Sequence, residues 1–425
     1  MSILVIEDGI VDRLHPVTTA RLSGAVTSGA LRLFDILTSL SVPLYGISRT
    51  HLHAIQRVDF VQIQDPKLAE PTDRPKLVIS ARVTPNVRTI QTLQKLISQP
   101  DSLPTTWLMD RNEPVGVLHP KATYSEIIKQ GSDFLKLNAP TRSDQVPTTV
   151  NNTQFIQLEA IQYPHELIQS HMRDFAENLQ WKIATGQYEQ LQDGVFVKPG
   201  MQLPNMVAVD VRSGPIVIES GVQIGPFSLL RGPLYLGEKC KVLEHSSLKD
   251  GVCAGHTTKI GGEVEASIIE PYTNKQHHGF LGHSYVGSWV NLGAGTCTSD
   301  LKNTYGHISM EYPTGRVSTG MQFLGCFIGD YSKTAINTSI FTGKWIGVCS
   351  AMYGFVTTNV PSFTNYAKLF GQIAQLPPSV MIATQQRMFN RRGVTQRQCD
   401  IDLIHALYDL TRKDREELID TEESL

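Results

Sequence analysis

The feature that most constrains this chain is a six-residue rhythm of aliphatic side chains in its second half. Eight consecutive members fall six positions apart: Ile218, Ile224, Leu230, Leu236, Val242, Leu248, Ala254 and Ile260. The rhythm then slips by two and resumes at Ile268, Asn274, Phe280, Val286 and Leu292, and it returns at Ile328, Thr334, Ile340, Ile346 and Met352. Several members precede glycine, as in IGPF, LGEK and LGAG.

A period of six fits neither the 3.6-residue repeat of an α-helix nor the alternation of an amphipathic strand. It fits a strand-plus-turn unit that forms one wall of a triangular prism, so that three units make a coil of about 18 residues. The aliphatic residue points inward, and glycine gives the corner its backbone freedom. We therefore predict a left-handed parallel β-helix over 193–360. A β-sandwich is the alternative, but it does not explain eight consecutive aliphatic residues at a spacing of six.

The flanking sequence predicts an α/β domain over 1–192 and a helical extension over 361–425. Strand patterns occur in LVIE, KLVISARV and TTWLMD, and helical apolar spacing occurs at 25–40, 86–98 and 164–192. In the extension, Leu403, Ile404, Leu407 and Leu410 share one helical face. Two segments, 265–280 and 299–323, are expected to leave the coil as loops, where function usually lies.

Charge and composition exclude several function classes. With 38 basic and 40 acidic residues, the chain lacks the positive charge for bulk binding to nucleic acid or an anionic membrane. Its longest apolar runs fall far short of the ~20 residues that cross a bilayer, and the amino terminus opens without a basic region. The six cysteines form no CxxC pair, which argues against zinc and disulfides. We expect a cytoplasmic protein.

Stacking brings distant residues together, because positions 18 apart lie above one another in such a coil. Arg231 and Lys249 have this spacing, and each follows an inward-pointing leucine. They are expected to leave the same face and grip a phosphate together. Two solvated surface cations are the alternative interpretation.

The densest polar cluster is NKQHH at 274–278, followed by Asn291 and the LGAGT segment. A histidine here has the pKa to accept a proton from an attacking amine near neutral pH. The backbone amides of Gly293 and Ala294 are candidates to hold a thioester or a pantetheine chain. A solvated surface loop is the alternative, and a metal site is disfavoured because no carboxylate or cysteine lies at ligand spacing.

The strings IGPFSLLRG and GHSYVGSWVNLGAGT resemble the acetyltransferase domain of a bifunctional enzyme family. That family joins glucosamine-1-phosphate N-acetyltransferase to N-acetylglucosamine-1-phosphate uridylyltransferase. The strings GGEVEASII, NKQHHGFLGHSYVG and NLGAGTCTSDLKNTYG are similar to a branch of its sugar-nucleotidyltransferase relatives. The resemblance implies acetyl-CoA as co-substrate, an amino-sugar 1-phosphate as acceptor, and a homotrimer with coenzyme A between neighbouring coils.

The resemblance also implies roles for single residues. Counting back from LGAGT puts the general base on His277 rather than His278. His256, in an AGHT string, is the rival base, and Phe280 replaces a tyrosine of the family. The implied substrate contacts are Arg231, Lys249, Lys275, Asn291 and Lys333, and the implied acetyl-CoA contacts are Gly293 and Ala294.

The amino-terminal half matches the nucleotidyltransferase pattern GxGTRLxPLT less well. Residues 7–18 keep RLxPxT but lack the glycine pair, and Asp12 adds negative charge. Arg13 is the predicted contact for the phosphates of a nucleoside triphosphate. Mg²⁺ would have to bridge the charges, and Asp110 is its predicted ligand.

Three functions follow from these patterns. The leading one is an acetyl-CoA-dependent N-acetyltransferase acting on an amino-sugar 1-phosphate, coupled to nucleotidyl transfer. The first alternative is a sugar-1-phosphate nucleotidyltransferase whose β-helix only oligomerises the chain. The second is a non-catalytic protein that binds sugar nucleotides.

Overall fold

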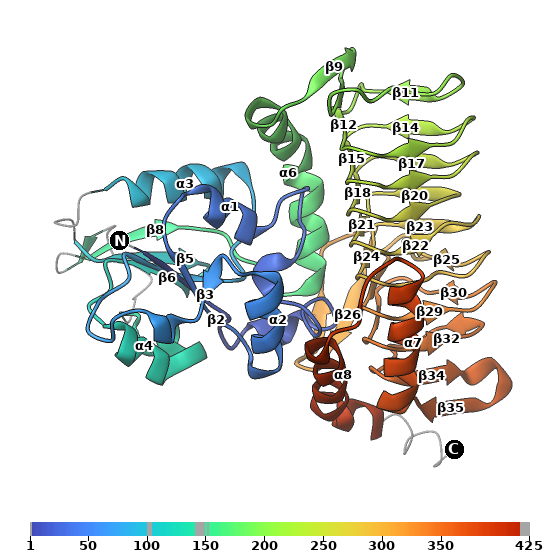
Figure 1. Cartoon of the computed structure of the whole chain (residues 1–425). Coiled ribbons are helices and arrows are strands. Elements are labelled where there is room, and N and C mark those ends of the chain that lie inside the picture. The colour runs from blue at the N-terminus through green and yellow to red at the C-terminus, as the bar shows by residue number, and fades with distance from the viewer. Residues whose placement is uncertain (1, 100–103, 141–148, 151–152, 417–425) are drawn as a thin grey trace. The chain divides into compact units, whose positions relative to one another are not determined.

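The computed structural model describes residues 2–99, 104–140, 149–150 and 153–416, and these form two units (Figure 1). The first unit comprises residues 1–14, 21–27 and 31–163, and the second comprises 15–20, 28–30 and 164–425. The boundary therefore comes about 30 residues before the predicted one at 192. It moves because helix α6 (Pro164–Thr185) belongs to the second unit, where Phe175 and Leu179 pack against Val217 and Cys253.

The first unit is the expected α/β fold. Its sheet has the order β3-β2-β1-β4-β6-β5-β8-β7, in which β1, β2, β3 and β4 run parallel and β6 is antiparallel to both neighbours. The strands are β1 (Ile3–Ile6), β2 (Leu44–Ile47), β3 (Ile63–Gln64), β4 (Leu77–Ser80), β5 (Thr106–Asp110), β6 (Glu113–Leu118), β7 (Thr149–Val150) and β8 (Thr153–Gln157). The helices are α1 (Leu33–Ser39), α2 (His53–Asp59), α3 (Val87–Ile97), α4 (Tyr124–Gln130) and α5 (Phe134–Asn138).

The second unit is the predicted left-handed parallel β-helix, and its short strands stack into the sheets of three walls (Figure 1). We name each sheet after its first parallel strand. The β10 sheet contains β10 (Val195–Val197), β12 (Ile216–Ile218), β15 (Leu234–Leu236), β18 (Val252–Ala254), β21 (Ile268–Ile269), β24 (Tyr285–Val286), β28 (Cys326–Ile328) and β31 (Lys344–Ile346), with β9 (Glu189–Gln192) antiparallel at its edge.

The other two walls are built in the same way. The β11 sheet contains β11 (Ala208–Asp210), β14 (Leu229–Arg231), β17 (Ser247–Lys249), β20 (Glu263–Glu265) and β23 (Phe280–Gly282), and β25 (Cys297–Thr298), β30 (Ser339–Ile340) and β33 (Phe355–Val356) form a further sheet. The β13 sheet contains β13 (Gln223–Ile224), β16 (Lys241–Val242), β19 (Lys259–Ile260) and β22 (Asn274–Lys275). Bridges through Asn291 join it to β29 (Lys333–Thr334), β32 (Ala351–Met352), β34 (Thr364–Ala367) and β35 (Gln372–Gln375).

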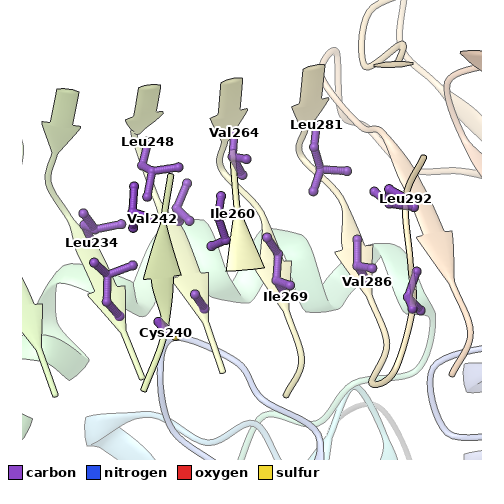
Figure 2. Close-up of a cluster of buried hydrophobic side chains, with 14 of the residues drawn as sticks. Leu234, Cys240, Val242, Leu248, Ile260, Val264, Ile269, Leu281, Val286 and Leu292 are labelled. Atoms are coloured by element: carbon purple, nitrogen blue, oxygen red, sulfur yellow. The ribbon is translucent and has the colours of Figure 1, made fainter. Parts of the chain in front are cut away.

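The aliphatic rhythm forms the core of the prism. All eight members of its first run, from Ile218 to Ile260, are buried in one hydrophobic cluster, several of which Figure 2 shows pointing into the column. The members at 328, 340, 346 and 352 belong to the same cluster. The period therefore predicted the inward positions wherever the coils keep 18 residues.

The predicted phase between residues 264 and 281 is wrong. Leu248 pairs with Val264 and Ile260 with Lys275, which are 16 and 15 positions apart instead of 18. The inward residues are Val264, Ile269, Lys275 and Leu281, not Ile268, Asn274 and Phe280. The corner at Gly261 and Gly262 permits this shortening, because a Cβ on Gly261 would lie 2.1 Å from the carbonyl oxygen of Gln276.

This shift also corrects one of the two predicted loops. Residues 265–280 run through β20, β21 and β22 as part of the wall. Residues 299–323 do leave the coil, and they contain the hairpin of β26 (Ser309–Tyr312) and β27 (Gly315–Ser318). The helical extension is present as α7 (Pro378–Asn390) and α8 (Gln398–Leu410), although β34 and β35 continue the wall past residue 360.

Candidate functional site

His277 and His278 lie at the corner that follows β22. Asn274 is bridged to Asn291, and the amide of Gly295 donates to the carbonyl of His278 at 3.0 Å. The two histidines therefore lie on the coil next to LGAGT, as predicted. Both imidazoles are exposed, so each is accessible to a substrate.

The backbone amides of the LGAGT corner differ in availability. The amide of Gly293 donates to Oγ1 of Thr334 at 2.8 Å, so it is already used within the protein. Among the described residues, the amide of Ala294 has no acceptor. Ala294 is thus free to meet an acyl donor, while the predicted contact through Gly293 is corrected by this internal bond.

Asn291 and Lys333 lie side by side in register on the β13 sheet. Asn291 is exposed, and its side-chain oxygen accepts from the amide of Asn274 at 3.3 Å. The ammonium of Lys333 donates to the carbonyl of Tyr331 at 2.9 Å, and burial lowers its pKa to about 8. Both predicted substrate contacts therefore lie on the wall that leads into the histidine corner.

Lys275 does not reach the surface. It takes the inward position that Ile260 holds one coil earlier, and only 2% of it is exposed. Its ammonium donates to the carbonyls of Gly261 at 2.7 Å, His277 at 2.8 Å and Gly279 at 3.1 Å. The predicted substrate contact is therefore wrong, because the slipped phase turns this lysine into the prism.

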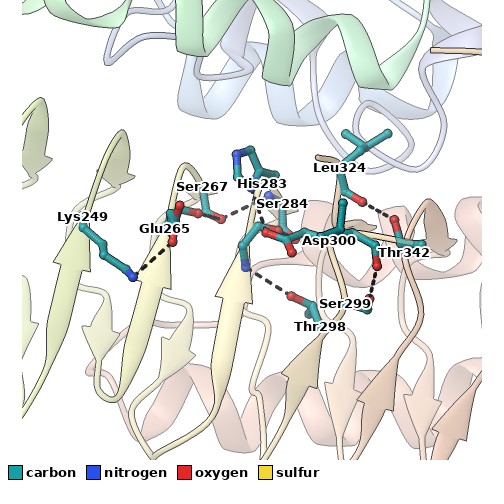
Figure 3. A network of polar contacts seen from close by, with 12 residues as sticks. Lys249, Glu265, Ser267, His283, Ser284, Thr298, Ser299, Asp300, Leu324 and Thr342 are labelled. Atoms are coloured by element: carbon teal, nitrogen blue, oxygen red, sulfur yellow. Dashed lines mark hydrogen bonds and ion pairs between the residues drawn. The ribbon is translucent and has the colours of Figure 1, made fainter. Parts of the chain in front are cut away.

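Arg231 and Lys249 are neighbours on the β11 sheet, as their spacing predicted, since Leu230 pairs with Leu248. Each is already neutralised. Arg231 contacts Asp210 and Asp250, both at 3.2 Å. Lys249 contacts Glu263 at 2.7 Å and Glu265 at 3.3 Å, and Figure 3 shows the Glu265 contact. A phosphate would have to displace these carboxylates, so the predicted clamp is not available as the chain stands.

The same pair is also remote from the histidine corner along the prism. His277 precedes β23, and β23 is two strands from the strand of Lys249 through β20. With a strand spacing of about 4.8 Å, this separation is on the order of 10 Å within one chain. The structure therefore does not bring the predicted cations and the predicted base together in a single protomer.

A histidine–carboxylate pair that sequence reasoning missed lies at a third corner. Nδ1 of His283 lies 2.8 Å from Oδ2 of Asp300 (Figure 3). The ring of His283 stacks on that of Phe323. Gly282 makes room for the carboxylate, because a Cβ there would lie 2.3 Å from Oδ2 of Asp300. The residues are 17 positions apart, so the stacking argument finds them only when the coil length of this region is known.

His256 is the less suitable rival base. Its ring packs edge-on against Tyr272, and Nδ1 lies 3.2 Å from Oγ1 of Thr257. His256 precedes β19, whereas His277 follows β22. His256 therefore lies at the corner before the wall of the β13 sheet, and LGAGT lies at the corner after it.

In the first unit, Arg13 lines a cavity of about 250 Å³ with Asp8, Arg82, Asp133 and Lys136. A larger cavity of about 660 Å³ adjoins the carboxyl ends of β1 and β2. Its charged lining residues are Glu7, Arg49, Arg57, Asp65 and Lys67. Ligands of open parallel sheets bind at such strand ends.

Carboxylates occupy part of this region. The buried guanidinium of Arg82 donates to Asp8 at 2.8 Å, and Arg49 donates to Glu7 at 3.1 Å. The amide of Ser23 also donates to Glu7. Two of the cations beside the predicted phosphate loop are thus satisfied from within the chain.

Asp110 is engaged in the same way. Its Oδ2 accepts from Arg111 at 3.0 Å and from Gln162 at 3.3 Å. No group of three histidine, cysteine, aspartate or glutamate side chains suited to a metal occurs among the residues that the model describes. Because Arg111 already pairs with this carboxylate, Asp110 does not fit its predicted role as a Mg²⁺ ligand, and we assign no metal to it. Within the same residues, no helix is long and apolar enough to span a bilayer.

No family model matches the chain. The chain is 30% identical over 148 residues to a bifunctional sugar-1-phosphate nucleotidylyltransferase/acetyltransferase of Sulfurisphaera tokodaii, covering 34% of this chain and 37% of that protein. It is 29% identical over 147 residues to bifunctional protein GlmU of a Cyanothece species, covering 34% and 25%. It is 27% identical over 168 residues to the uncharacterized acetyltransferase YaiX of Escherichia coli, covering 39% and 73%.

A solved acetyltransferase domain of PglB from Neisseria gonorrhoeae shares 10% identity with a TM-score of 0.20, covering 50% of this chain and 77% of its own, which adds nothing to the argument. The chain matches little more than a third of the Sulfurisphaera protein and a quarter of the Cyanothece protein. The family resemblance is confirmed at this level: the chain is similar in sequence to bifunctional sugar-1-phosphate nucleotidylyltransferase/acetyltransferases and to GlmU.

Proposed function

We propose that the β-helix unit is an acyltransferase that moves the acetyl group of acetyl-CoA to the amine of an amino-sugar 1-phosphate. One observation carries this proposal: an exposed imidazole, that of His277, lies one coil from the unused amide of Ala294. A base and an acyl-donor contact are the two groups that such a transfer needs close together.

In the proposed reaction His277 takes a proton from the substrate amine as its nitrogen attacks the thioester carbonyl. The new carbon–nitrogen bond forms, the carbon–sulfur bond breaks, and the proton passes from His277 to the leaving thiolate. The amide of Ala294 holds the acyl donor in position. Asn291 and Lys333, on the adjoining wall, contact the sugar phosphate.

We propose a homotrimer, and the exposure of the candidate site residues in one chain supports it. His277, Asn291 and Ile336 are exposed, and Ile336 is 69% exposed. Phe341 and Phe355, farther along the β-helix, are also exposed large apolar side chains. Large exposed apolar side chains are candidates for contact with another chain. We propose that a neighbouring copy completes the acetyl-CoA groove.

For the first unit we propose the binding of a nucleoside triphosphate or a sugar nucleotide, with Arg13 as a phosphate contact. The cavities at the ends of β1 and β2 support binding. The ion pairs of Glu7 and Asp8 use Arg49 and Arg82, so Arg13 is the phosphate contact that we propose for this unit. A sugar-1-phosphate nucleotidyltransferase remains the second candidate function, and exchange of pyrophosphate into a nucleoside triphosphate tests it.

We also propose a cytoplasmic location. None of the six cysteines forms a disulfide in the described part of the chain, and four of them are buried. Free thiols of this kind are typical of a reducing compartment.

The test of the acyltransferase is thiol release from acetyl-CoA in the presence of glucosamine 1-phosphate. His277→Ala should lower the turnover rate by about 10²–10⁴-fold, the usual contribution of a general base. His256→Ala is the matched control, since it removes an exposed imidazole from a different corner of the prism, and it should retain turnover. Full activity of His277→Ala would reject the assignment, and loss confined to His256→Ala would move the base to that corner.

A further inference from the structure

A second group of cations lies on the β13 sheet, at residues to which the sequence analysis assigned no role. Lys241 and Lys259 are paired in register on β16 and β19. Arg391 and Arg392 follow the last residue of α7, and the guanidinium of Arg392 donates to Oδ1 of Asn274, the next residue in the register after Lys259. Two strands and a helix end thus bring four cations to one surface.

No carboxylate neutralises this group within the described part of the chain. Lys241, Lys259, Arg391 and Arg392 form no ion pair there, in contrast to Arg231 and Lys249. The acidic residues of the same coils are used elsewhere or lie apart. Glu238 pairs with Lys239 at 2.7 Å, Glu263 and Glu265 pair with Lys249, and Glu244 contacts none of the four cations.

Packing holds the arginines in place. Phe389, in the last turn of α7, packs on Trp289 with ring centroids 4.5 Å apart, and Trp289 stacks on Tyr272 at 4.2 Å. Trp289 and Tyr272 belong to successive corners of the prism, so the end of α7 is attached to the wall beside Asn274. The guanidinium of Arg392, which also contacts Asn274, therefore needs little ordering before it binds a ligand.

The positive charges of the four side chains repel one another. Like charges directly opposite each other on neighbouring strands are destabilising. Burial lowers the pKa of Lys259, and the charges of Arg392, Arg391 and Lys241 lower it further. Burial and then Arg391 likewise lower the pKa of Arg392. The negative end of α7 offsets roughly half an elementary charge, which leaves most of the excess in place.

We propose that Lys241, Lys259, Arg391 and Arg392 form a binding site for a small phosphorylated compound that carries a diphosphate group. Several cations without a carboxylate partner suit a compact ligand with two or more negative charges. A long polyanion does not suit the site, because the whole chain carries a net charge of −2 and offers no continuous basic surface. The site lies on the same wall as Asn291, because Asn274 contacts both Arg392 and Asn291, but its binding does not depend on the proposed acyl transfer.

The test is titration calorimetry of the full chain with inorganic pyrophosphate at low salt, followed by CoA and dephospho-CoA. Lys259→Gln combined with Arg392→Gln should weaken pyrophosphate binding by about 10–100-fold or more, the loss expected for charge-assisted hydrogen bonds. Arg212→Gln is the matched control, because Arg212 is an exposed arginine of the same unit that already pairs with Asp210 at 2.7 Å. It should leave the affinity within about twofold, as expected for a surface residue outside the site.

The coenzyme titrations distinguish the source of the diphosphate. Equal binding of CoA and dephospho-CoA, both weakened by the double variant, would identify the diphosphate of a nucleotide as the ligand group. Pyrophosphate affinity that is unchanged in the double variant, or that falls equally in Arg212→Gln, would overturn the site. Circular dichroism and the melting temperature of each variant show that the prism is intact, and acetyl transfer is not part of the readout.

Discussion

Two walls of the same prism hold lysines and arginines in opposite electrostatic settings. On the β11 sheet, Arg231 and Lys249 stand between Asp210 and Glu265, so each cation has a carboxylate at the register position on its other side. On the β13 sheet, Lys241 faces Lys259, and the next position is the neutral Asn274. The comparison teaches that stacking distance alone does not make a phosphate site; the charge of the neighbouring strands decides whether a cation is available to a ligand.

Lys275 represents a third setting, in which carbonyls instead of carboxylates surround a cation. Burial lowers the pKa of its ammonium to about 8 from the ordinary 10.5. The folded pKa is the lower one, so between pH 8 and 10.5 the unfolded state binds more protons and the free energy of unfolding must rise with pH. Replacing this lysine gives the largest effect that we expect among the three settings.

Relative to Lys275→Met, the wild type should gain about 3 kcal/mol in unfolding free energy between pH 7 and 10.5, from 1.36 kcal/mol for each pKa unit. Urea unfolding of both proteins across this range measures the difference. Lys333, whose pKa also falls to about 8, is present in both proteins and cancels. A difference that stays flat, or that shrinks as the pH rises, would contradict this assignment.

Asn274→Asp would break the contrast between the walls by giving the β13 sheet a carboxylate. The new charge would accept from Arg392 and lie one strand from Lys259, so we expect a gain of about 1 kcal/mol in unfolding free energy. Pyrophosphate affinity should fall in the same variant. Asn365→Asp, whose register partner is the neutral Ala351, is the control and should give no gain. Equal stabilisation by both changes would show that repulsion among the four cations does not destabilise the wall.

Glu265→Gln would sharpen the contrast from the other side. Lys249 would keep Glu263 at 2.7 Å and lose its second carboxylate, so the loss in unfolding free energy should be only about 0.5 kcal/mol. The loss should diminish in 1 M NaCl, where surface charges are screened. Glu244→Gln, which removes an unpaired exposed carboxylate of the same prism, should cost less. A larger loss, or one that salt does not reduce, would mean that Glu265 stabilises the β11 sheet by more than its ion pair with Lys249.

Much of the site was predictable from the sequence, but unevenly. The proximity of Arg231 to Lys249 followed from spacing, and that of His277 to LGAGT followed from the family resemblance. The substrate role of Lys275 failed because the coils after Leu248 shorten, which a constant period cannot reveal. The His283–Asp300 pair was missed for the same reason, since both depend on coil length.

What the sequence determined by itself is the prism, because each inward aliphatic loses contact with water and a six-residue period is needed to bury every one of them. The tertiary structure alone decided which outward side chains meet. A coil shortened at Gly261 and Gly262 moves every later residue to a new neighbour, and electrostatic energy depends on that neighbour's charge and distance rather than on any pattern along the chain.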